Sequence, residues 1–450
     1  MSSRDDLKAE ACRIIDARRQ EIIDLGETIL RNPETGFNEV NTANLVAARL
    51  QGLGLDPRQG LAVTGVKGRK DCGGPGPTLA ILGELDSLRV SDHPHADPRT
   101  GAAHACGHNA QVAGMVGAAM GLLSAGVLPE LRGSLVFFAV PAEEMIDVDE
   151  RMQRKAHGEI EFLSGKAELI RLGHFDDVDL AMMFHTKTDT LASHVARSSN
   201  GAIIKKIRFV GKAAHAGGSP QKGINALNAA SLALSAIAYQ RETFYDEDTI
   251  RVHPIITRGG DAVSVVPAEV TVETFIRGKT LEGILDANRK VDNALRGAAM
   301  AVGASVEITT VPGYLPQANN EAMARLWGEN VGQVFGADQF EHGTEHRTSS
   351  TDMGDLAHIM PAMQPYVAGA AGGGHTSGYL LVDHDSVYVK SAKLLAMTAI
   401  DLLHDDAASA RRILREDRPR MTKEEYLEFQ RKLDATELFD PGSQPEGMGR

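Results

Sequence analysis

The stretch Ala103-His-Ala-Cys106-Gly-His108-Asn109-Ala110 places a thiol and an imidazole two residues apart, just before a long segment of small and apolar residues. Residues 110–125 have the pattern of a buried helix, and Asn109 is a residue type that caps helix N-termini. Cys106 and His108 are therefore expected on a loop that enters a helix, a place that lowers the pKa of a thiol. A thiolate and a neutral imidazole suit zinc and its neighbouring transition metals, so the pair predicts metal ligands if further donors lie close.

Size and charge set the broad class. The chain has 450 residues, which is more than one hydrophobic core normally serves, so two domains are expected. The net charge of −13 argues against nucleic acid or an anionic membrane as the main partner. The three cysteines make no disulfide framework, no signal peptide is visible, and no apolar run approaches the roughly 20 residues that span a bilayer. These features predict a cytoplasmic protein.

Helices and strands are expected to alternate over the first 200 residues or so. Apolar residues at helical spacing predict helices at 5–31, 42–53, 110–125 and 162–173, and short apolar runs predict buried strands at 78–86, 134–140 and 179–185. This order implies parallel pairing and an α/β sheet that helices cover on both faces.

The pattern changes near residue 198. The next elements are expected in the ferredoxin-like order β-α-β-β-α-β, with strands at 202–210, 249–257, 269–277 and 304–310 and helices at 224–240 and 281–303. Two more helices are predicted at 318–335 and 391–404. We therefore expect an α/β domain formed by 1–197 and 313–404, interrupted by an α+β insert at 198–312. The charged tail, 405–450, is expected to hold one helix at 423–433 and to end in a mobile Gly/Pro-rich segment.

Polar residues stand where the predicted strands of the α/β domain end. Asp86 ends the first strand, the pair Glu143-Glu144 follows the second, and His185 ends the third. Sites in open α/β sheets form beyond the carboxyl ends of the strands, so these side chains are expected to converge. Adjacent carboxylates there point to different sides, so one can bind a metal while the other faces water. Near a cation the pKa of water falls towards about 7, and a nearby carboxylate can accept its proton.

Seven segments, in matching order, resemble the aminoacylase/carboxypeptidase family of dinuclear metallopeptidases. They are Gly83-Glu-Leu-Asp86-Ser-Leu, His104-Ala-Cys106-Gly-His108-Asn, Pro141-Ala-Glu143-Glu144, Phe184-His185, Ala214-His215-Ala-Gly-Gly-Ser-Pro220, Gly223-Ile-Asn225-Ala and Gly374-His375-Thr. The resemblance covers roughly residues 5–404 and points to the amidohydrolase branch, which includes aminobenzoyl-glutamate and indole-acetyl-amino-acid hydrolases. It implies a phosphorylase/hydrolase-like catalytic α/β domain with an inserted ferredoxin-like α+β lid and dimerisation domain.

Carried over residue by residue, the resemblance implies a site for two divalent metal ions, which could be zinc, manganese or cobalt. The implied ligands are Cys106, His108, Glu144, His185 and His375. Glu143 would be the general base and later the general acid. Asp86 would orient a ligand, as metal-bound imidazoles usually require.

The insert is expected to supply substrate contacts. The resemblance implies that His215 and Asn225 contact the substrate or the developing oxyanion, His215 from the partner subunit of a homodimer or higher homo-oligomer. Arg277 ends a predicted strand and could clamp a substrate carboxylate with two hydrogen bonds, or equally form a structural salt bridge. Three departures from the family pattern matter. Asn109 stands where many members of the branch have Asp, and Ser264 replaces the Asn usual in its motif. The charged stretch 145–161 follows the glutamate pair directly.

The leading hypothesis is a metal-dependent hydrolase of a C–N bond, acting on the amide of an N-acyl or N-aroyl amino acid, a small carboxylate-bearing substrate. A second hypothesis is an aminohydrolase that releases ammonia from a substituted aminobenzoate. A third is a relative that only binds, which the six filled positions argue against. A thiol enzyme with Cys106 as nucleophile leaves the glutamates unexplained. In plainer interpretations, His185 is a core histidine and His375 part of a glycine-rich turn.

Overall fold

The computed structural model describes residues 3–443, which form two compact units. The first unit comprises the residues up to Ser198, Gln317–Glu345 and Asp352–Lys423. The second comprises Ser199–Pro316, His346–Thr351 and the described residues from Glu424 on. The second unit thus takes in part of the tail, which was predicted to lie outside both domains.

The first unit is built on a six-stranded sheet in the order β1-β2-β6-β3-β7-β19. Its strands are β1 (Arg58–Leu61), β2 (Gly65–Asp71), β3 (Thr78–Glu84), β6 (Ser134–Val140), β7 (Leu180–Met182) and β19 (Ala362–Met363). The last four are parallel, whereas β2 is antiparallel to β6 and β1 to β2. Every residue of β3 and β6 is buried, as in parallel sheets covered on both faces. The predicted α/β class is confirmed.

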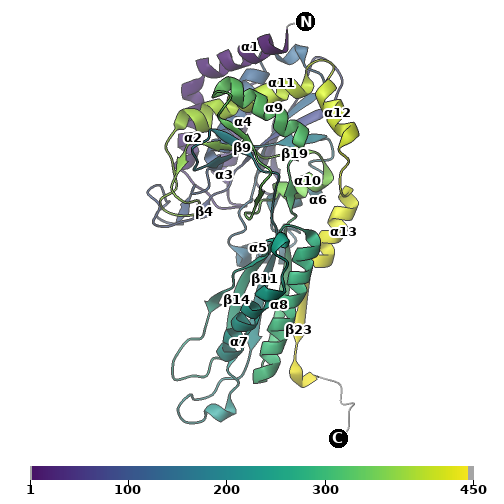
Figure 1. The fold of residues 1–450 in the computed structure, drawn as a ribbon. Helices are drawn as coiled ribbons and strands as arrows, with labels where there is room; N and C mark the ends of the chain where they lie inside the picture. Colours follow the sequence, from purple (N-terminus) through teal and green to yellow (C-terminus); the bar gives the residue numbers. More distant parts are fainter. Residues whose placement is uncertain (1–2, 444–450) are drawn as a thin grey trace. The chain divides into compact units, whose positions relative to one another are not determined.

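Helices pack around the apolar helix α4 (Figure 1). The first unit has α1 (Arg4–Ala17), α2 (Arg19–Leu30), α3 (Val40–Gly52), α4 (His108–Leu122), α5 (Val148–Ala156), α6 (Gly165–Arg171), α9 (Glu321–Val334), α10 (Met353–Ile359), α11 (Ser391–Leu403) and α12 (Ala408–Glu416). α4 contacts β3 on one side and α1, α2 and α11 on others. The single helix predicted at 5–31 is wrong, because the chain breaks at Arg18 so that α1 and α2 can each turn an apolar face towards α4.

The turn into α4 differs from the prediction. The cap residue is Gly107, with φ of 90°, so the predicted Asn109 cap is wrong. A side chain at Gly107 would overlap Oγ1 of Thr186, so this tight turn requires glycine. The Nδ2 amide of Asn109 instead donates to the Gly26 carbonyl, at 3.2 Å, and to the Tyr388 hydroxyl, at 2.9 Å. Asn109 thus ties α4 to neighbouring segments.

The chain leaves the central sheet earlier than predicted. The strand expected at 179–185 ends at Met182, and His185 opens a strand of another sheet, which has the order β17-β9-β20-β8. These strands are β8 (His185–Lys187), β9 (Ser193–Val195), β17 (Phe340–His342) and β20 (Tyr366–Ala368). Shorter strands are β4 (Leu88–Arg89), β5 (Ala102–Ala103), β10 (Ser198–Ser199), β16 (Gln317–Ala318), β18 (His346–Arg347), β21 (Ala370–Ala371) and β22 (Leu380–Leu381).

The second unit is an antiparallel sheet packed against two helices. The order is β12-β14-β11-β15-β23, with β13 also paired to β14. The elements are β11 (Gly201–Val210), α7 (Ala226–Tyr239), β12 (Arg251–Val252), β13 (Ile255–Arg258), β14 (Glu269–Gly278), α8 (Leu281–Val302), β15 (Ser305–Tyr314), α13 (Lys423–Leu433) and β23 (Ala435–Phe439). Apart from the split of 249–257 into β12 and β13, the elements follow the predicted ferredoxin-like order.

The tail contributes more structure than expected. The helix predicted at 423–433 is α13, and α12 and β23 are additional. β23 lies beside β15, and Arg296 and Glu437 pair at 2.6 Å across α8 and β23. The strand was missed because Ala-Thr-Glu-Leu-Phe is short and mostly exposed. The predicted mobile segment falls on residues 444–450, which lie outside the described residues. Among the described residues, no helix is long and apolar enough to cross a membrane.

The packing of α4 can be tested with a pair of glycine variants. In Gly117→Ala the new Cβ would lie 2.8 Å from the Ala392 Cβ, so we expect a loss of about 1–3 kcal/mol from overpacking. In Gly297→Ala, within α8, no atom lies within 4 Å, so a gain of about 0.5–1 kcal/mol is expected from helix propensity. Calorimetric unfolding of both variants measures the difference; equal shifts would contradict close packing at α4.

Candidate metal centre

Three sets of metal-binding side chains lie together in the first unit. Within each set, one ligand atom per residue lies within 4.8 Å of the others. The sets are Cys106, His108 and His185; Cys106, Glu144 and His375; and Glu84, His108 and Glu143. Because Cys106 and His108 are each shared between two sets, the three are contiguous. The structure thus brings the five predicted ligands and Glu143 into one cluster, here called the metal cluster, which Glu84 also joins.

Backbone carbonyls fix the rings of two histidines in the metal cluster. Nδ1 of His108 lies 2.9 Å from the Asp86 carbonyl oxygen, and Nδ1 of His185 lies 2.8 Å from that of Thr186. A carbonyl can only accept, so Nδ1 is the donor in both rings, and Nε2 of the neutral ring carries a lone pair. In His185 this Nε2 lies 3.3 Å from the Cys106 sulfur. Both rings present their metal-binding nitrogen to the cluster.

Asp86 connects two members of the metal cluster. Its Oδ2 accepts from the backbone N–H of Glu144 at 2.8 Å, and its Oδ1 lies 3.2 Å from Nδ1 of His108. Asp86 is fully buried two residues beyond the end of β3, and Glu144 lies four residues beyond the end of β6. Because β3 and β6 are adjacent parallel strands, their carboxyl ends deliver both residues to the same edge.

His375 reaches the metal cluster from a glycine-rich turn. Its backbone N–H donates to the Ala105 carbonyl at 2.9 Å, and its Nε2 lies 3.3 Å from Oε1 of Glu144. Its φ of 63° lies in the left-handed region, which is unusual for a residue with a side chain and is typical of functional sites. The side chain is 56% exposed, so His375 lies on the open side of a group whose other members are buried or partly buried.

The metal cluster shifts the pKa values of its acids in opposite directions. Burial disfavours the Glu144 carboxylate, but the neighbouring His375 ring outweighs this cost and lowers the pKa of Glu144 to about 2. Burial and Glu144 oppose ionisation of Cys106, yet His185 and His108 outweigh them and lower the thiol pKa to about 6. Burial, with Glu84 and Glu144, instead raises the pKa of Glu143 well above its usual value. The two predicted ligands thus favour their ionised, metal-binding forms.

Unsatisfied buried atoms test whether a metal fits. Oδ1 of Asp86, Nε2 of His108 and Oε1 of Glu144 are buried without a hydrogen-bond partner. Such atoms are costly to bury, and a bound cation would satisfy lone pairs of this kind. The donor set of one thiolate, three imidazoles and carboxylates suits zinc, manganese or cobalt. The residues fit a divalent metal.

Several charged residues around the metal cluster were not predicted from the sequence. Lys166, completely buried, lies 2.6 Å from Oε1 of Glu84 and 2.5 Å from Oδ1 of Asp352. Arg151 lies in α5, inside the charged stretch 145–161, and donates to the Glu144 carbonyl at 2.6 Å. A signal for Glu84 existed: residues two apart on a strand face the same side, so Glu84 accompanies Asp86.

The residues predicted to contact the substrate, His215, Asn225 and Arg277, lie in the second unit. His215 is exposed, and its Nδ1 accepts from the backbone N–H groups of Gly217 and Gly218 at 3.1 and 3.0 Å. Asn225 caps α7, its Oδ1 accepting from backbone N–H groups, which leaves its Nδ2 amide to donate elsewhere. The Arg277 guanidinium lies 5.1 Å from the Phe275 ring centre, and no ion pair involving it is found among residues 3–443.

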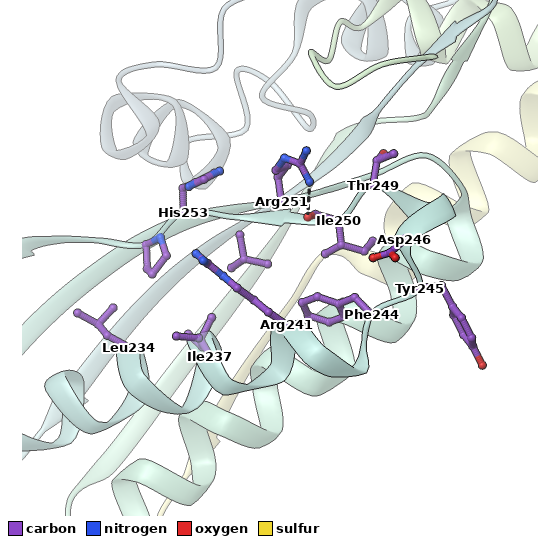
Figure 2. Close-up of a pocket in the computed structure, with 13 residues that line it drawn as sticks. Leu234, Ile237, Arg241, Phe244, Tyr245, Asp246, Thr249, Ile250, Arg251 and His253 are labelled. Atoms are coloured by element: carbon purple, nitrogen blue, oxygen red, sulfur yellow. Dashed lines mark hydrogen bonds between the residues drawn. The ribbon is translucent and has the colours of Figure 1, made fainter. Parts of the chain in front are cut away.

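The second unit also has a pocket of about 490 Å³ between the end of α7 and β12 (Figure 2). Apolar side chains such as Ile237 and Phe244 line it together with the cationic Arg241 and Arg251. No residue of the metal cluster lies in this pocket, so the chemistry implied by that cluster is not located here.

Comparison with known proteins relates the chain to one family. The peptidase dimerisation domain of the M20 family matches residues 197–301. The Xaa-Arg dipeptidase of Mus musculus is 28% identical over 337 residues, which are 73% of this chain and 71% of that protein. A p-aminobenzoyl-glutamate hydrolase chain of Escherichia coli is 29% identical over 305 residues, or 65% of this chain and 58% of that protein.

Solved structures share the fold. A dinuclear metal-binding peptidase of the M20 family from Bacillus subtilis matches 86% of this chain and 99% of its own, with a TM-score of 0.64 and 20% identity. The predicted architecture of a catalytic α/β domain with a dimerisation domain is therefore confirmed. The resemblance seen in the seven sequence segments is also confirmed, because the chain carries an M20 peptidase dimerisation domain, is similar to named amidohydrolases, and shares its fold with a dinuclear M20 peptidase.

Proposed function

We propose that this protein hydrolyses the amide bond between an acyl or aroyl group and an amino acid, with Glu143 as general base. The observation that carries the proposal is the convergence of Glu143 with a full set of metal donors at one sheet edge. Cys106, His108, Glu144, His185 and His375 would hold two divalent ions. Bound ions of this kind lower the pKa of water and polarise a carbonyl.

The residues of the chain divide the remaining work. Glu143 would take the proton of the attacking water and later give it to the leaving nitrogen. Its burial beside Glu84 and Glu144 raises its pKa, which favours a group that must hold a proton between two steps. Asp86 would keep His108 and the Glu144 backbone in place through its two oxygens.

The names of three relatives support this substrate class. Three relatives are named as hydrolases of p-aminobenzoyl-glutamate, indole-3-acetyl-aspartic acid and Xaa-Arg dipeptides. Each of these substrates has an amide bond next to an amino-acid carboxylate. A small substrate of that kind would suit the donor groups of the second unit, because His215, Asn225 and Arg277 can donate hydrogen bonds to a carboxylate or an oxyanion.

A substrate panel tests this function. N-acyl and N-aroyl amino acids, Xaa-Arg dipeptides and substituted aminobenzoates would be incubated with the protein and Zn²⁺, Mn²⁺ or Co²⁺. We expect release of a free amino acid from at least one amide. Glu143→Gln should lower kcat about 10²–10⁴-fold at unchanged metal content, because the proton acceptor is lost.

The control is Glu168→Gln, since Glu168 is a buried carboxylate paired with Arg171 and outside the metal donor sets. This variant should keep wild-type turnover. Ammonia without an amino-acid product would instead establish an aminohydrolase. Tight substrate binding without turnover would establish a relative that only binds, and near-normal turnover by Glu143→Gln would refute the role of that residue.

We also propose that the second unit forms a homodimer through its edge strand β13. Ile255 and Ile256 on this strand are 61% and 38% exposed, and an apolar sheet edge is a ready pairing surface. Light scattering should give twice the chain mass, and Ile255→Lys with Ile256→Lys should give the monomer. Leu438→Lys, on the opposite edge strand β23, is the control and should leave the dimer intact. A dimer that survives the double substitution would exclude this edge.

A further inference from the structure

The Glu84 carboxylate faces a histidine nitrogen with which it forms no hydrogen bond. Oε2 of Glu84 lies 3.0 Å from Nε2 of His108, and both side chains are buried to at least 99%. Nδ1 of His108 donates to the Asp86 carbonyl, so Nε2 of the neutral ring is an acceptor, as is the carboxylate. Nε2 has no hydrogen-bond partner. A carboxylate and a ring nitrogen this close share either a proton, which the Glu84 charge favours by raising the pKa of His108, or a metal ion.

The position of Glu84 is fixed by its other contacts. Its Oε1 accepts from Lys166 at 2.6 Å, and its Oε2 accepts from Nε2 of Gln111 at 2.9 Å. Oε1 of Gln111 in turn accepts from the Glu84 backbone N–H at 3.1 Å. Lys166 is itself held by Asp352. The carboxylate therefore cannot turn away from His108 without breaking buried charge-assisted hydrogen bonds.

The spacing is that of two ligands on one ion. Ligands bound at about 2.1 Å to a tetrahedral or octahedral cation lie about 3.0–3.4 Å apart. The Glu84–His108 distance of 3.0 Å matches this, as do the 3.3 Å distances of Cys106 to His185 and of His375 to Glu144. A Glu84 carboxylate oxygen also lies within 4.8 Å of a Glu143 oxygen.

We propose that Glu84 is a further metal ligand, which Lys166 and Gln111 hold in place. It would bind the same divalent ion as His108 through Oε2, while Lys166 neutralises the charge on the other oxygen. The proposal rests on the proposed function in so far as that function requires bound metal. It adds a carboxylate to the five ligands that the family resemblance implies.

Cobalt(II) binding by the full chain tests the proposal. Metal-free wild-type protein would be titrated with Co²⁺ by calorimetry and by visible absorption, and Glu84→Gln would be treated in the same way. We expect two equivalents in the wild type. In Glu84→Gln we expect one of them to bind at least about 100-fold more weakly, with a changed cobalt spectrum, because an amide is a poorer ligand than a carboxylate.

Two further variants complete the test. Glu168→Gln removes a buried carboxylate outside the metal donor sets and should bind both equivalents normally. Glu84→Asp keeps the negative charge but shortens the side chain by one methylene, so we expect its Co²⁺ affinity to lie between those of the wild type and Glu84→Gln. This variant also tests the proposal if Glu84→Gln fails to fold. If the folded Glu84 variants bind two equivalents of Co²⁺ with wild-type affinity and an unchanged spectrum, Glu84 is not a ligand, and the proposed function still stands. Failure of the wild type to bind Co²⁺ would overturn the proposed function as well.

Discussion

Buried negative charge in need of a cation is the constraint on which the first unit depends. Five carboxyl side chains are buried at or near the carboxyl ends of β3 and β6: Glu84, Asp86, Glu143, Glu144 and Asp352. Lys166 pairs with Glu84 and Asp352. The remaining carboxylates lie close to one another and to the three imidazoles and the thiol of the metal cluster. Burying such a group costs several kcal/mol per unpaired charge, so an arrangement of this kind is retained where a bound ion repays it.

The scaffold of this charge cluster is apolar and rigid. β3 and β6 are buried at every residue, and α4 is buried along its whole length against them and against neighbouring helices. Gly107 permits the sharp turn that places Cys106 before α4 and His108 within its first turn. Side chains held by strand ends and a helix start have little freedom to move. Such rigidity limits the rearrangement that binding of an ion would require.

Much of this arrangement could be predicted from the sequence, for physical reasons. Apolar runs such as 134–140 identify buried strands, and polar residues at their ends mark the sheet edge where sites form. What failed depends on tertiary contacts. The break at Arg18 follows from packing on α4, and β23 is a strand because β15 offers an unpaired edge. Glu84 was missed because a carboxylate at the end of an apolar run looks like the end of a strand, and the sequence pattern does not show its buried partners Gln111 and Lys166, which are 27 and 82 residues away.

The second unit supplies a different chemistry from the first. Nδ1 of His215 accepts two backbone N–H groups, so its Nε2 carries the hydrogen in the neutral ring and can donate. The side-chain oxygen of Asn225 accepts hydrogen bonds from the first turn of α7, so only its amide N–H groups are available to bind other groups. Arg277 is a donor by nature. The residues predicted to contact substrate therefore offer donors, whereas the metal cluster offers acceptors. Donors of this kind suit an anionic group, whereas the acceptors of the metal cluster suit cations, so the two units differ in the kind of group that each can bind.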